Sequence, residues 1–130
     1  MINAESGSEK YLTLLSNGAV SITSDTTQSK GGGGEYLRPH DLLCAGFASC
    51  LNISVRMVLE EMNIDYEKVV TKVDVNRDQE DNTIFLYDID IIGDIDTATK
   101  ESVLSKASNC PVRKTLSKNI DFQPSDKISD

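Results

Sequence analysis

Tryptophan is absent from this sequence of 130 residues, and only 5% of the residues are aromatic. There is a single histidine, so a closed zinc site with four protein ligands would be hard to assemble, and neither a metal nor a cofactor is expected. The three cysteines are an odd number and form no CxxC motif, which argues against the disulfide framework of a small secreted protein. They are therefore expected to be thiols, of which one pair could be redox-active.

Basic residues are also few, with 13 Lys and Arg against 21 Asp and Glu and a net charge of −8. Nucleic-acid binding relies on basic side chains that replace counterions along phosphates, so no nucleic-acid partner is expected. No run approaches the roughly 18 apolar residues of a membrane span, and residues 1–8 lack the layout of a signal peptide. The sequence predicts one cytoplasmic domain over residues 1–130, without a membrane partner.

Short strands are predicted at the start of the chain. Residues 11–15 and 19–23 flank Asn17-Gly18, a dipeptide that strongly favours a hairpin. Residues 1–8 are expected to fray.

Residues 25–36 are rich in Thr, Ser, Gln and Lys and contain four consecutive glycines. This composition cannot pack a core, so a flexible loop is expected. Gly31–Gly34 do not match a phosphate-binding loop, because Glu35-Tyr36 follows where Lys-Ser or Lys-Thr is required.

A long helix is predicted from Pro39 to about Met62. Proline suits the first turn, and Asp41 suits the positive end of the helix dipole. The apolar residues form two adjacent rows, at positions 43, 47, 51, 55, 58 and 62 and at positions 42, 46, 50, 53 and 57. At roughly 100° per residue the two rows cover more than half of the circumference. We therefore expect a central helix that other elements wrap over most of its surface.

The rest of the chain is predicted to form two strands, two helices and an edge strand, at residues 69–76, 84–91, 97–109, 111–116 and 120–122. The two strands alternate as a meander with one buried face. Asp96 or Thr97 is the expected cap of the first helix, and residues 123–130 are expected to fray. This order of elements predicts an α+β fold.

Cys50 lies near the middle of the apolar arc of the predicted long helix, so it is expected to be buried. Burial raises the pKa of a thiol and makes it inert, which favours a core cysteine. To react, Cys50 would need a nearby cation or hydrogen-bond donors that stabilise its thiolate.

Cys110 directly precedes Pro111 at the start of a predicted helix, where free N–H groups favour a thiolate. The alternative is a small residue that fills a cap position. Cys44 lies six residues before Cys50, about 9 Å along the helix axis, which is too far for a disulfide. Cys44 and His40 have the i, i+4 spacing of two metal ligands, but without further histidines Cys44 is interpreted as a packing residue.

Two cysteine-centred segments carry a family resemblance. Residues 38–50, Arg-Pro-His-Asp-Leu-Leu-Cys-Ala-Gly-Phe-Ala-Ser-Cys, resemble the helix signature of the OsmC/Ohr family. Residues 110–116, Cys-Pro-Val-Arg-Lys-Thr-Leu, resemble the second signature of that family. The resemblance covers roughly residues 10–122. It implies an OsmC-like fold, an antiparallel sheet wrapped around a long central helix, in an intertwined homodimer.

The resemblance also implies a thiol-dependent peroxidase that reduces small organic hydroperoxides in oxidative stress defence. By position, Cys50 would attack the peroxide and become a sulfenic acid. Cys110 would resolve it as a disulfide, which a cellular dithiol would reduce. The alternative is a catalytically weak OsmC-like protein that binds a small apolar or acyl ligand in the dimer pocket, and a redox sensor or a structural role also stays open.

The chain departs from the peroxidase pattern in two places. His40 replaces the glutamate that follows the helix-opening proline in the peroxidases, and Asp41 comes one position later. The peroxidases also stabilise the thiolate with an arginine from the N-terminal strand region, whereas residues 1–37 contain no arginine. Arg38, His40 and Asp41 are therefore the candidates for supporting a thiolate at Cys50.

Overall fold

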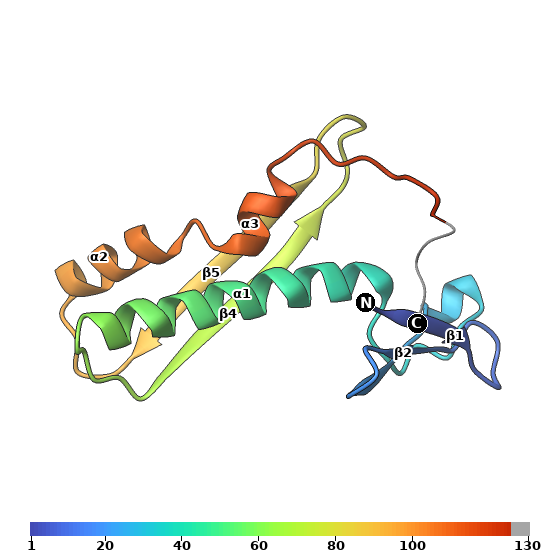
Figure 1. Cartoon of the computed structure of the whole chain (residues 1–130), viewed down its shortest axis with the longest axis horizontal. Helices are drawn as coiled ribbons and strands as arrows, with labels where there is room; N and C mark the ends of the chain where they lie inside the picture. Colours follow the sequence, from blue (N-terminus) through green and yellow to red (C-terminus); the bar gives the residue numbers. More distant parts are fainter. Residues whose placement is uncertain (126–130) are drawn as a thin grey trace. The chain divides into compact units, whose positions relative to one another are not determined.

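The computed structural model describes residues 1–125, so the predicted fraying of residues 126–130 lies outside the described residues. In chain order the elements are β1 (Asn3–Ser6), β2 (Thr13–Ser16), β3 (Ser21–Ser24), the 3-10 helix η1 (Gln28–Lys30), α1 (Pro39–Glu61), β4 (Lys68–Asn76), β5 (Ile84–Ile92), α2 (Thr97–Ala107) and α3 (Pro111–Leu116) (Figure 1). The predicted α+β class is confirmed.

Residue contacts group the chain into two compact units. The first unit contains Met1–Ala48 and Lys72–Asp88, and the second contains Ser49–Thr71 and the chain from Ile89 onward. The long helix α1 and the hairpin of β4 and β5 each contribute residues to both units.

The first unit contains a three-stranded antiparallel sheet in the order β1-β2-β3. The predicted hairpin between β2 and β3 is confirmed: Asn17 Oδ1 accepts the backbone N–H of Val20 at 2.9 Å, and Gly18 has a left-handed φ of 91°. Strand β1 contradicts the expectation that residues 1–8 fray. All four of its residues pair with β2, which supplies the backbone partners that a terminal segment lacks by itself.

The glycine-rich segment 25–36 is held by side-chain and backbone hydrogen bonds, which its composition did not predict. The carboxylate of Asp25, which is 5% exposed, accepts the backbone N–H of Thr26 at 2.7 Å and of Gly33 at 2.8 Å. Further backbone hydrogen bonds run from Gly31 to Gln28, from Gly32 to Thr27 and from Gly34 to Thr26. Composition misled the prediction because a buried carboxylate, not an apolar core, organises this loop.

The core of the second unit lies between α1, β5 and α2. Five buried residues form it: Val55 and Leu59 of α1, Ile91 of β5, and Val103 and Ala107 of α2. Accordingly, α2 lies alongside the C-terminal part of α1 (Figure 1). The predicted cap of α2 is confirmed, because the Asp96 carboxylate accepts the backbone N–H of Thr99 at 2.7 Å.

Only one face of α1 is buried. Its buried residues are four apart along the helix: Phe47, Leu51, Val55 and Leu59. By contrast, Leu43, Ile53 and Met57 are 49%, 44% and 59% exposed. The expectation that α1 is wrapped over most of its surface is therefore wrong for the described chain, whose own elements cover one face of the helix.

By length and composition alone, α1 is apolar enough to cross a membrane, with a mean hydropathy of 1.7 over an 18-residue window. This corrects the expectation that no segment is long and apolar enough to resemble a membrane span. The core helix of a soluble protein meets the same test, so the composition of α1 does not distinguish between the two environments.

The C-terminal part of the described chain contains the predicted helix α3 but no strand at residues 120–122. Ile120 is 54% exposed and Phe122 is 92% exposed. The alternation of apolar residues suggested an edge strand, but a strand requires a neighbour to pair with, and the described residues provide none there.

A candidate two-thiol site

Two segments of the second unit bring Cys50 and Cys110 together. Cys50 lies in the middle of α1, and Cys110 is the N-cap residue of α3, with Pro111 in the first turn. The backbone N–H of Val112 donates to Cys50 Sγ at 3.4 Å, and the thiol of Cys110 is hydrogen-bonded to that of Cys50. The two cysteines are sixty residues apart in the sequence and direct neighbours in the fold.

The burial of the two thiols differs from the sequence-based expectation. Cys50 was expected to be buried but is only partly buried, because its row on α1 is not covered by the described chain. Cys110 is 2% exposed and belongs to the core. Cys50 is therefore the thiol that a small molecule can reach.

Burial also decides the protonation state of Cys110. Desolvation is the largest of the effects that raise the pKa of this thiol, and the hydrogen bond with Cys50 raises it further. The backbone N–H groups of Arg113 and Val112 act in the opposite direction and are outweighed. The prediction that the helix terminus favours a thiolate at Cys110 is therefore wrong: the residue is held as a neutral thiol that can donate to Cys50.

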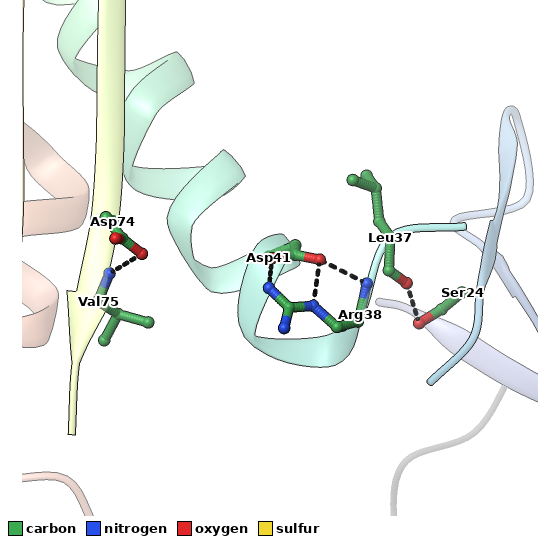
Figure 2. Close-up of polar contacts among 6 residues, drawn as sticks. All are labelled: Ser24, Leu37, Arg38, Asp41, Asp74 and Val75. Atoms are coloured by element: carbon green, nitrogen blue, oxygen red, sulfur yellow. Dashed lines mark hydrogen bonds and ion pairs between the residues drawn. The ribbon is translucent and has the colours of Figure 1, made fainter. Parts of the chain in front are cut away.

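The candidates for supporting the thiolate interact with one another in the first unit. Arg38 donates to the Asp41 carboxylate from Nε at 2.9 Å, from Nη2 at 2.8 Å and from its backbone N–H at 2.8 Å (Figure 2). The hydrogen bond from the Arg38 side chain is the main reason why the pKa of Asp41 is lowered. The same partner raises the pKa of the Arg38 guanidinium.

Helix geometry separates these candidates from Cys50 of the same chain. His40 and Asp41 precede Cys50 by ten and nine residues on α1. At a rise of about 1.5 Å per residue, this is about 14 Å along the axis. The structure therefore does not bring them to the thiol on their own helix.

The arginines of the second unit also have other partners. Arg56 Nε donates to Asn52 Oδ1 at 3.0 Å, and Asn52 Nδ2 donates to the carbonyl of Val69 at 2.9 Å. Arg113 Nη1 donates to the carbonyl of Ser108 at 3.1 Å. The contacts found at Cys50 thus come from an N–H group and a thiol, which can stabilise a thiolate by hydrogen bonding.

Sequence reasoning missed the backbone N–H of Val112. The available signal was the proline after Cys110, which marks a helix start and hence a group of N–H donors without helical partners. That these donors meet Cys50 depends on how α3 packs, which no local pattern reveals.

Cys44, the third cysteine, lies in the first unit and lines a cavity there. Burial is the largest effect on its pKa, which it raises, and the carboxylates of Asp74 and Asp41 act in the same direction. It is thus held as a neutral thiol. Among residues 1–125, no group of three or more His, Cys, Asp and Glu side chains could hold a metal ion.

Comparison with known proteins gave one family and several solved structures. The family model described as OsmC-like protein matches residues 32–125. No curated protein sequence gave a significant match.

Three solved structures illustrate the structural likeness. The OsmC organic hydroperoxide resistance protein from Legionella pneumophila has 22% identity and a TM-score of 0.64, over 93% of this chain and 90% of that chain. A putative osmotic stress induced and detoxification response protein from Psychrobacter arcticus has 22% identity and a TM-score of 0.72, over 88% and 85%. The organic hydroperoxide resistance protein OhrB of Bacillus subtilis has 20% identity and a TM-score of 0.62, over 93% and 92%. At this level of identity the likeness shows a common fold.

Proposed function

Because this chain belongs to the OsmC-like protein family, we propose that it is a thiol-dependent peroxidase that reduces organic hydroperoxides. The observation that carries the proposal is the hydrogen-bonded pair of Cys50 and Cys110. Two of the similar solved structures are organic hydroperoxide resistance proteins, which supports the choice of substrate class.

The proposed reaction has two steps on the protein. The Cys50 thiolate attacks one oxygen of the hydroperoxide, so that an S–O bond forms, the O–O bond breaks and the alkoxide leaves as the alcohol after taking a proton from water. The thiol of Cys110 then attacks the sulfur of the resulting sulfenic acid, water leaves, and a disulfide forms. The peroxide gains two electrons, and a cellular dithiol returns them to the protein by thiol–disulfide exchange.

The different burial of the two thiols supports this division of roles. Cys50 is accessible and accepts the N–H of Val112, a contact that favours a negative sulfur. Cys110 is buried and stays protonated, which keeps it from competing for the peroxide. It is nevertheless close enough to attack once Cys50 has been oxidised.

The exposed apolar face of α1 supports a homodimer as the working form. Leu43, Ile53 and Met57 are about half exposed, and large apolar side chains exposed together on a helix favour a protein partner. In an antiparallel pair of α1 helices, Arg38, His40 and Asp41 of one chain would approach Cys50 of the other. In the homodimer these residues would therefore support the Cys50 thiolate of the partner chain, which they cannot reach on their own helix.

The fold is that of a soluble protein. In that setting α1, despite its apolar composition, is a helix of the folded domain. We place the protein in the cytoplasm, where a dithiol reductant is available and free cysteines persist.

The experiment that tests the proposal is a count of free thiols after treatment with cumene hydroperoxide. The reduced protein has three thiols per chain, and we expect two of them to disappear. In Cys50→Ser no thiol should be lost, because the attacking sulfur is missing. In Cys110→Ser the Cys50 sulfenic acid should persist and be trapped by dimedone, whereas Cys44→Ser should behave as the wild type.

Three unreacted thiols in the wild type would contradict the proposed peroxidase activity. The alternative, a protein that binds a small apolar or acyl ligand, would then be favoured. Loss of two thiols in Cys50→Ser would contradict the assigned roles. Circular dichroism of each variant shows whether a negative result reflects misfolding.

A further inference from the structure

The side chain of Arg113 connects two helices next to the two-thiol site. Arg113 belongs to α3, and its Nη1 donates to the carbonyl of Ser108 at 3.1 Å. Ser108 is the C-cap residue of α2, and only Asn109 and Cys110 separate it from α3. The guanidinium group therefore bridges the end of α2 and the first turn of α3.

This hydrogen bond satisfies a backbone group at the end of α2. The last carbonyls of a helix have no partner within the helix. The N–H and the hydroxyl of Ser108 are bonded back into α2, to the carbonyls of Leu104 at 3.0 Å and Ser105 at 3.2 Å. Its carbonyl accepts from Arg113, and a hydrogen bond from a charged donor is roughly twice as strong as one between neutral groups.

The orientation of α3 depends on such contacts with the rest of the chain. The helix contains six residues, and a helix of this length is not stable by itself. Its N-cap residue, Cys110, is buried in the core, but the burial of apolar surface is not directional. The bond from Arg113 to Ser108 adds a directional contact, because a hydrogen bond requires a particular angle at the donor.

The orientation of α3 in turn decides what Cys50 contacts. Val112 directly precedes Arg113, and its N–H donates to Cys50 Sγ at 3.4 Å. Hydrogen bonds weaken steeply as the N–H turns away from its acceptor, so a modest rotation of α3 would remove this contact. A donor at the sulfur favours the thiolate, and its loss would favour the neutral thiol.

We propose that Arg113 is a positioning residue for the Cys50 thiolate. By holding α3 at the carbonyl of Ser108, it keeps the N–H of Val112 directed at Cys50 Sγ. Arg113 thus acts through Val112 and not on the sulfur itself. The inference rests on the proposed peroxidase only for its consequence, the rate of attack on the hydroperoxide, since the ionisation of Cys50 is measured without peroxide.

The test is the pH profile of Cys50 alkylation by iodoacetamide in the reduced full chain, read out by peptide mass mapping. The thiolate is the form that reacts, so the profile reports the ionisation of Cys50. Arg113→Met keeps an unbranched side chain but removes the donors. We expect alkylation of Cys50 at pH 7 to become about tenfold slower and the profile to move up by about one pH unit, the effect of one hydrogen bond to a charged group.

Two further variants separate position from charge. Lys114→Met removes the same charge from the next residue of α3, whose side chain is exposed, and should keep the wild-type profile. Arg113→Lys retains a charged donor without the planar fork of the guanidinium. It should show a smaller shift in the same direction, and it becomes the test if circular dichroism shows that Arg113→Met does not fold.

The shape of the profile distinguishes positioning from a merely structural role. If Arg113 positions the donor, the rates of wild type and variant converge at alkaline pH, where Cys50 is ionised in both. If Arg113 only stabilises α3, its loss exposes Cys50 and changes the rate by the same factor at every pH.

Three results would overturn the inference: an unchanged profile in folded Arg113→Met, an equal shift in Lys114→Met, or a change of rate that does not depend on pH. Its failure is distinguishable from that of the peroxidase. A profile that depends on Arg113 in a protein that does not consume cumene hydroperoxide would support the positioning role and contradict the peroxidase. Consumption of the peroxide with a profile that does not depend on Arg113 would do the reverse.

Discussion

The glycine-rich loop provides a prediction that can be worked out from the structure, the substitution Gly32→Ala. A Cβ at this position would overlap the carbonyl oxygen of Thr26 and lie 2.6 Å from Asp25 Oδ1. Neither atom is the end of a long flexible side chain, since one is backbone and the other belongs to a buried, hydrogen-bonded carboxylate. The loop must therefore shift to accept a methyl group.

The expected cost follows from the hydrogen bonds that this shift would break. The bond from Gly33 N–H to Asp25 Oδ2 involves a charged acceptor and contributes about 1.5–3 kcal/mol. The bond from Gly34 N–H to the carbonyl of Thr26 contributes about 0.5–1.5 kcal/mol. We expect a loss of about 2–4.5 kcal/mol in the free energy of unfolding. For 130 residues this lowers Tm by about 7–16 °C.

Thermal unfolding by circular dichroism measures this loss, and hydrogen exchange of the amides of Gly33 and Gly34 localises it. Gly33→Ala should cost less, because its Cβ would meet only Asp25 Oδ2, at 3.0 Å. Ser29→Ala, an exposed change in the same loop, should stay within about 0.5 kcal/mol of the wild type.

If the loop were mobile, Gly32→Ala would raise the free energy of unfolding and not lower it. Alanine would then restrict only the unfolded chain and raise stability by about 0.4–1 kcal/mol. An unchanged or raised Tm of Gly32→Ala would therefore refute the hydrogen-bonded loop.

The remaining predictions concern pH and association. The pKa of Cys110 is raised by burial, so its contribution to stability is complete below the ordinary thiol pKa of about 8.5 and is lost as the pH rises through the folded-state pKa. Urea unfolding of the wild type should show this alkaline loss, which Cys110→Ser should lack. The pKa of Asp41 is lowered by Arg38, so this carboxylate stabilises the fold above about pH 3.9 and progressively less as the pH falls. Asp41→Asn should cost less than about 1 kcal/mol at neutral pH, because the pair is exposed, and a cost that persists at pH 2 would contradict the ion pair. Met57→Asp should turn the proposed dimer into monomers in analytical ultracentrifugation, whereas Glu60→Gln should not; a monomeric wild type would rule out the dimer.

Most element positions were predicted from the sequence. The helix predicted from Pro39 to about Met62 ends at Glu61, and the strand predicted over residues 84–91 extends by one residue. The caps at Asp96 and Cys110 were also placed correctly. These features depend on side-chain periodicity and on the few residues around each end, which are local properties of the chain.

The errors share a cause. Each depends on whether a hydrogen-bond partner from elsewhere in the chain is present. This holds for strand β1, for the hydrogen bonds of the glycine-rich loop and for the missing strand at residues 120–122. Cys50 was expected to be buried from its helical position, but the elements that would cover its row are not supplied by the described chain. Composition predicts which residues can be buried, and packing selects those that are.

The sequence by itself therefore determined the α+β order of elements, the single long helix and the three free cysteines, because each follows from spacing and composition along the chain. Only the tertiary structure decided that Cys50 and Cys110 meet, that the accessible thiol is the one on the helix, and that burial outweighs the helix terminus at Cys110. The reason is physical: a thiol is tuned by the atoms around it in space, and here those atoms come from segments sixty residues apart.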